Sequence, residues 1–459
     1  MSTVAAPPAR LRPVLPRAIG AWSAAAVLVG STIGSGIFRV PTEVALATGT
    51  VGGIALLWIG GAVIALCGAL TLAELAVMMP SSGGIYVFIR EAWGPLPAFL
   101  FGWTRLLVIQ PAVLGAISLI FASYIGAFIP IDPGTQRIIA ACLVVLLAAA
   151  NCRSTRWGAA VQNISTAAKV ITLAGLALLA FAFGEPAAGA FTDADWGIAG
   201  AAGFGGALVV IMWTYDGWAD LTYMAGEVRD PQRVLPRALI GGTLAVVVIY
   251  LLVNAAYLYV MPVSDMSSSP LVAADAATRL FGTAGASIAA ALVLVSTFGA
   301  LNGTLMTGPR IFFALADDRL FFRSVARVHP KFETPFVAIA VAGVLGVCYL
   351  SVRSFEQLAE AFVLGVWPFY VLAVGAVFRM RRMAPEIHRP YRVPGYPVVP
   401  TIFLLASAWM LGDALVRDIV STLSGFAIIG AGAPVYFFWR ARRDAAGRPH
   451  SVDTPSRGP

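Results

Sequence analysis

Long apolar runs separated by short polar segments dominate the chain. Twelve runs are nearly free of charge, at residues 18–38, 44–73, 106–131, 138–152, 157–184, 196–215, 238–264, 280–309, 334–352, 361–378, 393–412 and 419–439. Most are long enough for a helix of about 20 residues to cross a membrane. The pattern predicts an all-α polytopic membrane protein with about twelve transmembrane helices, in which the run at 138–152 is short for a span.

Composition agrees with this pattern. Only 12% of the residues are charged and 59% are hydrophobic, whereas a soluble domain carries about 25% charged residues. The net charge of +8 therefore reflects membrane topology, and no nucleic-acid partner is expected. Residues 1–17 and 441–459 are polar and are predicted to be disordered cytoplasmic tails.

The arginines define the orientation. With the N-terminus inside, the outer segments hold only Arg39, Arg137, Arg279, Arg353 and Arg417. Apart from Arg105, which lies near the inner end of the third span, every other arginine then falls on the inner side. Because cytoplasmic loops are enriched in Lys and Arg, we expect both termini in the cytoplasm of a cell that carries the protein in its plasma or inner membrane.

The first run has three glycines in seven residues, at Gly30, Gly34 and Gly36. Glycine inside a helix costs about 1 kcal/mol relative to alanine, so one interpretation is a deliberate break. The half-helix after such a break presents free N–H groups and a positive dipole end that suit a carboxylate. The other interpretation is close helix packing through small residues.

The sixth span is the second irregular one. Directly after the run at 196–215 it holds Asp216, Gly217 and Asp220 between aromatic residues. A transporter built from inverted repeats has interrupted helices at corresponding places in its two halves, and spans one and six fit a five-plus-five repeat. The alternative is an aromatic helix end with Asp216 already in water, but the polar cytoplasmic exit follows well after this residue.

Isolated polar residues occur in several other spans. Lys169 is one of two lysines in the chain and lies about 12 Å into the fifth span. It either extends to the inner interface or faces a polar interior, where it replaces a bound cation or carries a proton. Glu74, at the end of the second span, is best explained as an ion-pair partner. Tyr250 and Asn302 fit either a site or helix packing.

Several motifs in order resemble the amino acid–polyamine–organocation (APC) transporters. They are Gly30 to Phe38, Ala73-Glu74-Leu75 with Pro80 to Tyr86, Gly102-Trp103, Tyr215-Asp216-Gly217-Trp218 with Glu227 to Pro231, Asn302 with Arg310 and Ala314, and Arg389 to Pro397. They extend over nearly the whole chain. The lysine in span five and the Gly-Trp in span six look most like the L-type branch (LAT).

This resemblance implies a LeuT-type fold. It would have an inverted repeat at 18–184 (spans 1–5), a second at 196–380 (spans 6–10), spans 11 and 12 at 381–440, and discontinuous helices 1 and 6.

The resemblance also implies site residues. Ser35 and Gly36 match backbone donors for the substrate carboxylate, with the break opened at Gly34. The carbonyl of Thr32 matches an acceptor for the substrate ammonium. Trp213, Thr214 and Asp216 match positions that complete the ammonium site and its gate. Lys169 matches a lysine that occupies the place of a sodium ion in relatives, so sodium dependence is not expected.

Two departures from the L-type pattern stand out. Many L-type members have a small residue where this chain has Asp216. This carboxylate could hold the substrate ammonium, admit cationic substrates or carry a proton. In addition, the outer loop at 127–136 lacks the cysteine through which eukaryotic members join a heavy chain. We therefore expect a stand-alone, prokaryote-like form.

The function expected is secondary active transport of L-amino acids, neutral ones first, by sodium-independent exchange or facilitated movement with alternating access. Alternatives are a proton-coupled symporter, a cationic amino acid or polyamine carrier that uses Asp216, and an amino-acid sensor. An enzyme is not expected, because the three histidines show no metal-ligand spacing and no phosphate-binding loop is visible. No cofactor or metal is expected; the partners are the amino acid and the lipid bilayer.

Overall fold

The computed structural model describes residues 15–126, 128–187, 204–269, 271–417 and 419–447. Within these ranges the regular structure is helical apart from one isolated bridge between Ile19 and Val228. The all-α architecture is confirmed. Leu15 is buried and the last helix continues to Gly447; residues 1–14 and 448–459 of the predicted tails lie outside the described residues.

The described helices group into twelve segments that correspond to the twelve predicted spans. Seven are single helices: α3 (Val51–Met78), α7 (Pro133–Arg153), α8 (Thr155–Phe183), α11 (Pro231–Val260), α16 (Phe336–Val352), α17 (Phe355–Met383) and α18 (Val398–Arg417). Five are interrupted: α1 (Ala21–Thr32) with α2 (Gly36–Thr48); α5 (Pro95–Thr104), η1 (Arg105–Ile109) and α6 (Gln110–Ile125); α9 (Phe204–Tyr215) with α10 (Asp220–Tyr223); α14 (Thr283–Thr307) with α15 (Pro309–Asp317); and α19 (Ile419–Gly430) with α20 (Gly432–Gly447).

By length and composition, eight of the described helices can cross a membrane, or nine if α1 and α2 count as one bent span. Helices α9 and α16 are apolar but shorter. The connections contain further short helices: α4 (Ile85–Trp93), η3 (Ala225–Glu227), α12 (Val263–Ser268), α13 (Val272–Phe281) and η4 (Arg323–Ala326).

Some helices extend beyond the apolar runs that predicted them, because the runs were ended at charged residues that the helices include. The first span does not end at residue 38, because α2 continues through Arg39 to Thr48, and Gly49 ends it in the left-handed conformation at φ 65°. The short run at 138–152 is part of the 21-residue helix α7, because the Asp132 carboxylate accepts the Thr135 N–H at 2.9 Å and caps the helix earlier.

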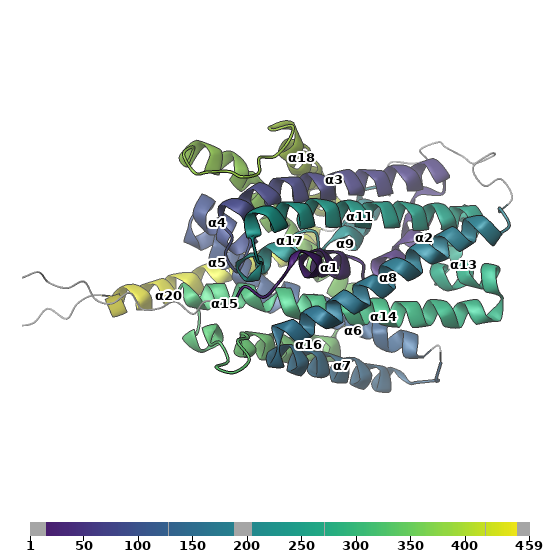
Figure 1. Ribbon diagram of the computed structural model, residues 1–459, viewed down its shortest axis with the longest axis horizontal. Coiled ribbons are helices and arrows are strands. Elements are labelled where there is room, and N and C mark those ends of the chain that lie inside the picture. Colours follow the sequence, from purple (N-terminus) through teal and green to yellow (C-terminus); the bar gives the residue numbers. More distant parts are fainter. Residues whose placement is uncertain (1–14, 127, 188–203, 270, 418, 448–459) are drawn as a thin grey trace, which may run out of the picture.

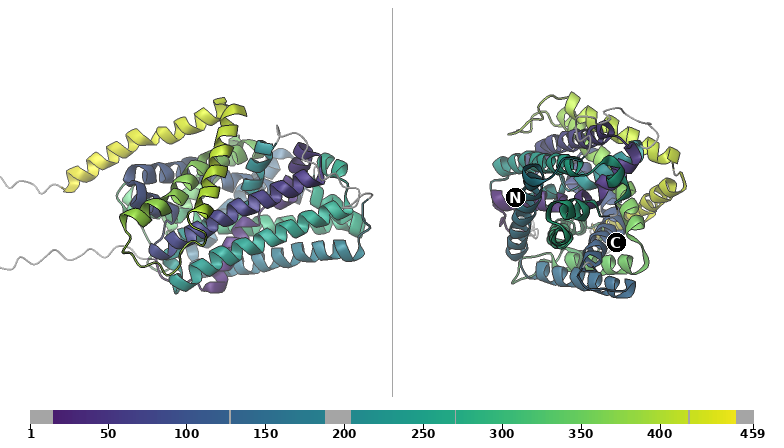
Figure 2. Two further views of the ribbon diagram at one scale, coloured as in Figure 1. Left: turned by 90° about the horizontal axis from the view of Figure 1, so that it is seen from above. Right: turned by 90° about the vertical axis from the view of Figure 1, so that its right-hand side faces the viewer.

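The interrupted first span lies at the centre of the bundle. In Figure 1, α1 lies among α8, α11 and α14, and it packs against all three, while α2 packs against α9. Helices α4, α15 and α20 gather at the left-hand end, and α13 lies at the right-hand end. The end-on view in Figure 2 shows the helices in cross section. Two of the five interrupted spans, one and six, therefore lie inside the bundle.

The ends of three central segments meet on one side. The Ile19 N–H donates to the Glu227 carbonyl at 2.9 Å, and the Arg229 N–H donates to the Ile19 carbonyl at 2.8 Å. The Glu227 carboxylate in turn accepts two bonds from the Arg310 guanidinium, at 2.8 and 3.0 Å. Ile19, Glu227 and Arg310 are all buried, so the segment before α1, the exit of span six and the start of α15 form one unit.

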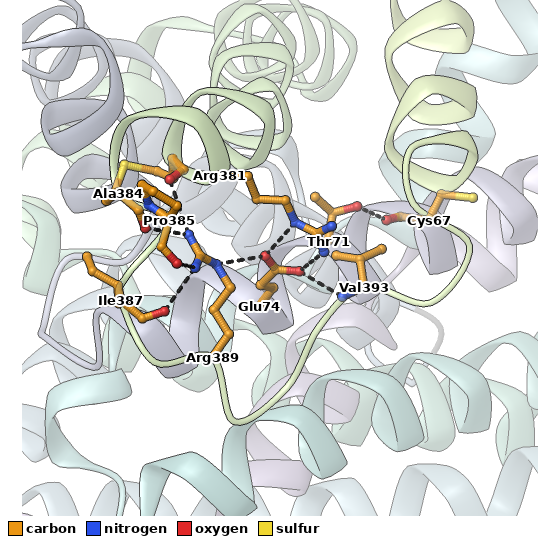
Figure 3. Close-up of polar contacts among 10 residues, drawn as sticks. Cys67, Thr71, Glu74, Arg381, Ala384, Pro385, Ile387, Arg389 and Val393 are labelled. Atoms are coloured by element: carbon orange, nitrogen blue, oxygen red, sulfur yellow. Dashed lines mark hydrogen bonds and ion pairs between the residues drawn. The ribbon is translucent and has the colours of Figure 1, made fainter.

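A second ionic cluster surrounds Glu74 at the end of α3 (Figure 3). Its buried carboxylate accepts two bonds from Arg381, at 2.9 and 2.6 Å, and one from the Val393 N–H at 2.7 Å. Arg389 lies 3.5 Å away. Arg389 also donates to the backbone carbonyls of Met380, Ala384, Pro385 and Ile387. The ion-pair interpretation of Glu74 is confirmed: it joins α3 to the end of α17 and to the segment before α18.

Replacing Glu74 with Gln should destabilise the protein markedly. Two guanidinium groups would remain at a buried site without their carboxylate, and breaking a buried ion pair costs about 3–5 kcal/mol. The melting temperature of the detergent-purified protein should fall by several degrees. Glu91→Gln is the matched control, because Glu91 pairs with Arg90 while 46% exposed, and such pairs contribute less than about 1 kcal/mol. Equal melting temperatures for the two variants would contradict this role of Glu74.

Candidate substrate-binding site

The first span is broken where the glycines predicted it. Helix α1 ends at Thr32 and α2 begins at Gly36, and the two axes meet at 41°. Ser35 precedes α2 without capping it through its side chain. The first N–H groups of α2 therefore lack a side-chain acceptor, and the positive end of the helix dipole lies behind them.

The sixth span is broken in the same manner. Helix α9 ends at Tyr215, and a turn that includes Asp216 and Gly217 precedes α10 at Asp220. Gly217 has a φ of 116°, a conformation that residues with a Cβ rarely adopt. Discontinuous helices 1 and 6 are therefore confirmed, and Asp216 lies at the break itself.

Two glycines allow the breaks to touch. A Cβ on Gly36 would lie 2.6 Å from the Thr214 hydroxyl and 2.9 Å from the Thr214 Cα. A Cβ on Gly217 would lie 2.6 Å from the Thr32 hydroxyl and 2.8 Å from the Thr32 Cα. Each break thus presses a glycine against the backbone of the other span, a reciprocal contact that only glycine fits.

Lys169 faces the first break. On α8 the residues Gln162, Thr166, Lys169 and Leu173 recur at helical spacing and are buried, whereas Ile164 and Ile171 on the other face are 72% and 71% exposed. The Lys169 ammonium donates to the carbonyls of Gly30, at 2.7 Å, and Ile33, at 2.6 Å. It therefore faces the interior and binds the negative end of α1; the snorkelling alternative is wrong.

Two hydroxyl groups complete the cap on the break. Tyr250 lies with its hydroxyl 2.8 Å from the Thr32 carbonyl and 3.1 Å from the Thr214 carbonyl, so it bridges the ends of α1 and α9. The Ser296 hydroxyl lies 3.2 Å from the carbonyls of both Ile33 and Gly34. Carbonyl groups freed by the break are thus satisfied by side chains from α8, α11 and α14.

One cavity lies between the two breaks. It is lined by all seven residues predicted to bind substrate: Thr32, Gly34, Ser35, Gly36, Trp213, Thr214 and Asp216. A second cavity of about 320 Å³ adjoins it and shares Ser35, Gly36 and Trp213. The Trp213 ring meets Phe362 edge-on, with centroids 4.7 Å apart. Trp213 therefore lies between the central cavity and the larger one.

The cavity wall also contains residues that the sequence did not assign to it. Arg105, at the start of the π-helical turn η1, and Asp220 are among them. Arg105 is only 2% exposed, and its Nε and Nη1 have no partner among the described residues. An unpaired buried donor costs about 1–3 kcal/mol, and more when charged. A charge inside a span was the signal that could have identified both residues.

Asn302 lies outside the cavity wall. Its amide nitrogen donates to Gln162 at 2.9 Å and to the Gly158 carbonyl at 3.0 Å, and its oxygen accepts from Asn151 at 2.9 Å. Thr304, on the same helix, lines the cavity instead. The position of Asn302 favours the packing interpretation, in which it joins α14 to α7 and α8.

Two broken helices that meet at a polar cavity inside a helical bundle are an arrangement typical of membrane transporters. A family model described as amino acid permease matches residues 19–433. The chain is 32% identical to the serine/threonine exchanger SteT of Bacillus subtilis over 94% of this chain and 98% of that protein. It is 33% identical to the human b(0,+)-type amino acid transporter 1, over 86% and 82% of the two chains, and to the mouse large neutral amino acids transporter small subunit 2, over 93% and 82%.

The chain belongs to the amino acid permease family and is an amino acid transporter of the APC superfamily. The resemblance to the L-type branch and the expected fold class are confirmed. It is a multi-pass membrane protein and a transporter by family. The repeat boundaries at 18–184 and 196–380 stay predictions.

Replacing Lys169 with Gln should reduce amino acid uptake by more than about tenfold, because the carbonyls of Gly30 and Ile33 would lose a charged donor at a buried site. Lys331→Gln is the matched control: it changes the other lysine of the chain, which is exposed. Uptake into proteoliposomes and the melting temperature should be measured for both. Normal uptake by the Lys169 variant would show that the break does not need this cation.

Proposed function

We propose that the protein exchanges neutral L-amino acids across the membrane by alternating access, without sodium. The observation that carries this proposal is the contact of the Lys169 ammonium with the Gly30 and Ile33 carbonyls at 2.7 and 2.6 Å. Such carbonyls, at the negative end of a broken helix, are suited to bind a cation. A covalently attached cation already occupies them, so a sodium ion has no place there.

The break supplies groups for both ends of an amino acid. In this proposal the N–H groups at Ser35 and Gly36 take the carboxylate at the start of α2. The Thr32 carbonyl has a second lone pair beside the one that Tyr250 uses, and together with the end of α9 it takes the ammonium. Trp213 separates this site from the outer cavity and acts as its gate.

Several features support neutral substrates. The central wall contains one arginine and two aspartates, so a cationic and an anionic side chain would each meet a group of like charge. Two relatives also support this proposal by their names, one a serine/threonine exchanger and the other a transporter of large neutral amino acids. Exchange is supported by the same bacterial relative, which matches this chain over nearly its full length.

The same proposal places both termini in the cytoplasm of a cell whose plasma or inner membrane holds the protein. The arginine distribution supports it, because the outer segments hold only five arginines under this orientation. The outer connection at 127–136 contains no cysteine. We therefore propose a transporter that works without a disulfide-linked heavy chain.

Proteoliposomes provide the direct test. Labelled alanine should enter sodium-free vesicles preloaded with unlabelled amino acid, and entry into empty vesicles should be at least about tenfold slower. If an inward proton gradient drives flux into empty vesicles, the protein is a proton symporter and the exchange proposal is wrong. Binding of alanine without flux under any gradient would show a sensor and overturn the transport proposal.

A second candidate rests on Asp216, whose carboxylate lines the cavity and accepts a bond from the Tyr370 hydroxyl at 2.6 Å. An acid at this position could carry a proton or bind a cationic substrate. Against the cationic substrate stands Arg105 in the same wall, whose positive charge offsets one of the two carboxylates. The proposal therefore keeps neutral exchange first.

Two measurements separate these candidates. With neutral exchange, alanine uptake should be equal at two external pH values, and arginine and putrescine should not compete. Asp216→Asn should then lower alanine uptake without creating any pH dependence, whereas Asp265→Asn, outside the wall of the central cavity, should leave it unchanged. A proton-driven uptake that Asp216→Asn abolishes would favour the symporter.

A further inference from the structure

The wall of the central cavity contains both polar and apolar side chains. Arg105, Asp220 and Thr304 form its polar part, whereas Val113, Ile117 and Phe362 are apolar members of the same wall. An amino acid whose charged groups occupy the break can therefore place its side chain against either kind of residue.

Arg105 is incompletely satisfied in this wall. Its Nε and Nη1 have no hydrogen-bond partner, and it forms no ion pair within the described part of the chain. The centroid of the Tyr223 ring lies 5.3 Å from the guanidinium carbon, and Asp220 and Asp216 are close enough for their charges to act on it. Buried polar groups in native proteins almost always have a partner, so a ligand or water must supply the acceptor here.

The local backbone also sets this residue apart. Arg105 begins a π-helical turn of five residues within a span that is otherwise α-helical. Such turns are rare and occur frequently at functional sites. A purely structural arginine at membrane depth would be expected to pair fully with carboxylates, and this one does not.

The carboxylates beside it provide acceptors. Asp216 accepts a bond from Tyr370 at 2.6 Å, and Asp220 accepts a longer one from Thr307 at 3.3 Å. Each carboxylate can accept further hydrogen bonds. The polar part of the wall thus offers free donors on Arg105 and free acceptors on the two aspartates.

We propose that Arg105 and Asp220 select the side chain of the substrate, and that they favour neutral side chains that both accept and donate a hydrogen bond. Hydroxyl and carboxamide groups meet this requirement. An acidic side chain would satisfy Arg105 but meet two carboxylates, and an aliphatic one would leave the guanidinium unpaired. The inference rests on the proposed amino-acid site at the break and specifies which substrates that site takes.

Competition between isosteric substrates tests it in the wild-type protein. Labelled alanine is the reporter, and the competitors are threonine against valine and serine against 2-aminobutyrate, pairs in which a hydroxyl replaces a methyl group. A site that hydrogen-bonds a hydroxyl discriminates strongly against the analogue without it. We expect the hydroxyl member to inhibit at a concentration at least about tenfold lower. A ratio near one would overturn the inference without any variant.

Two variants then assign the preference to Arg105. Arg105→Met removes the donors and Arg105→Lys keeps the charge but not the planar fork. Both should lower alanine uptake and bring the hydroxyl-to-methyl ratio toward one, the methionine variant most. Arg353→Met, an exposed arginine outside the cavity, is the matched control and should keep both uptake and ratio.

The remaining outcomes are distinct. An unchanged ratio in variants that still transport alanine would overturn the role of Arg105. Aspartate as the strongest competitor would show that Arg105 binds an acidic side chain instead. Absence of alanine flux in the wild type would contradict the proposed function itself, whereas flux with no hydroxyl preference would contradict this inference alone.

Discussion

The contact between the Lys169 ammonium and the end of α1 is the interaction on which the central architecture depends. A helix that stops inside a membrane leaves carbonyl groups without partners, and the bilayer offers no water to satisfy them. Lys169 satisfies the carbonyls of Gly30 and Ile33, and Ser296 lies beside Gly34. The cation also neutralises the negative end of the helix dipole. Because the charge belongs to the chain, the break persists without an ion from solution.

Spans one and six are also held to each other, so they form a single central element. Tyr250 bridges the carbonyls of Thr32 and Thr214 at the breaks. On the side of the Ile19 bridge, Glu227 contributes its carbonyl to Ile19 and its carboxylate to Arg310. A movement that separates α15 from span six must therefore expose a buried ion pair, which makes such a movement cooperative. This is the behaviour required of a two-state element, because intermediate positions leave charges unpaired at a buried site.

The sequence was sufficient for features that follow from the cost of burying polar backbone and charge. Glycines in the first run and acids in the sixth span indicated both breaks, and a buried cation was one of the two interpretations of the lysine at depth. Side-chain direction was not accessible in the same way. Asn302 and Thr304 are two residues apart, so they lie about 200° apart around the helix, and only Thr304 lines the cavity. Arg105 lies near a predicted helix end and also fits an interfacial residue. Helix α13 was missed because Asp275 and Arg279 interrupt its apolar pattern.

The reciprocal contact of Gly36 and Gly217 limits how the central element can change over evolutionary time. Most steric conflicts in a protein core can be relieved by shortening the neighbouring side chain. Here an added Cβ would meet the Cα of Thr214 or of Thr32 at 2.9 or 2.8 Å, and every amino acid has that atom. No second substitution at the facing threonine can rescue the first. Substitutions in the cavity wall can change substrate preference one residue at a time. At Gly36 and Gly217, by contrast, no single or paired substitution gives a tolerated intermediate, so these two positions stay glycine.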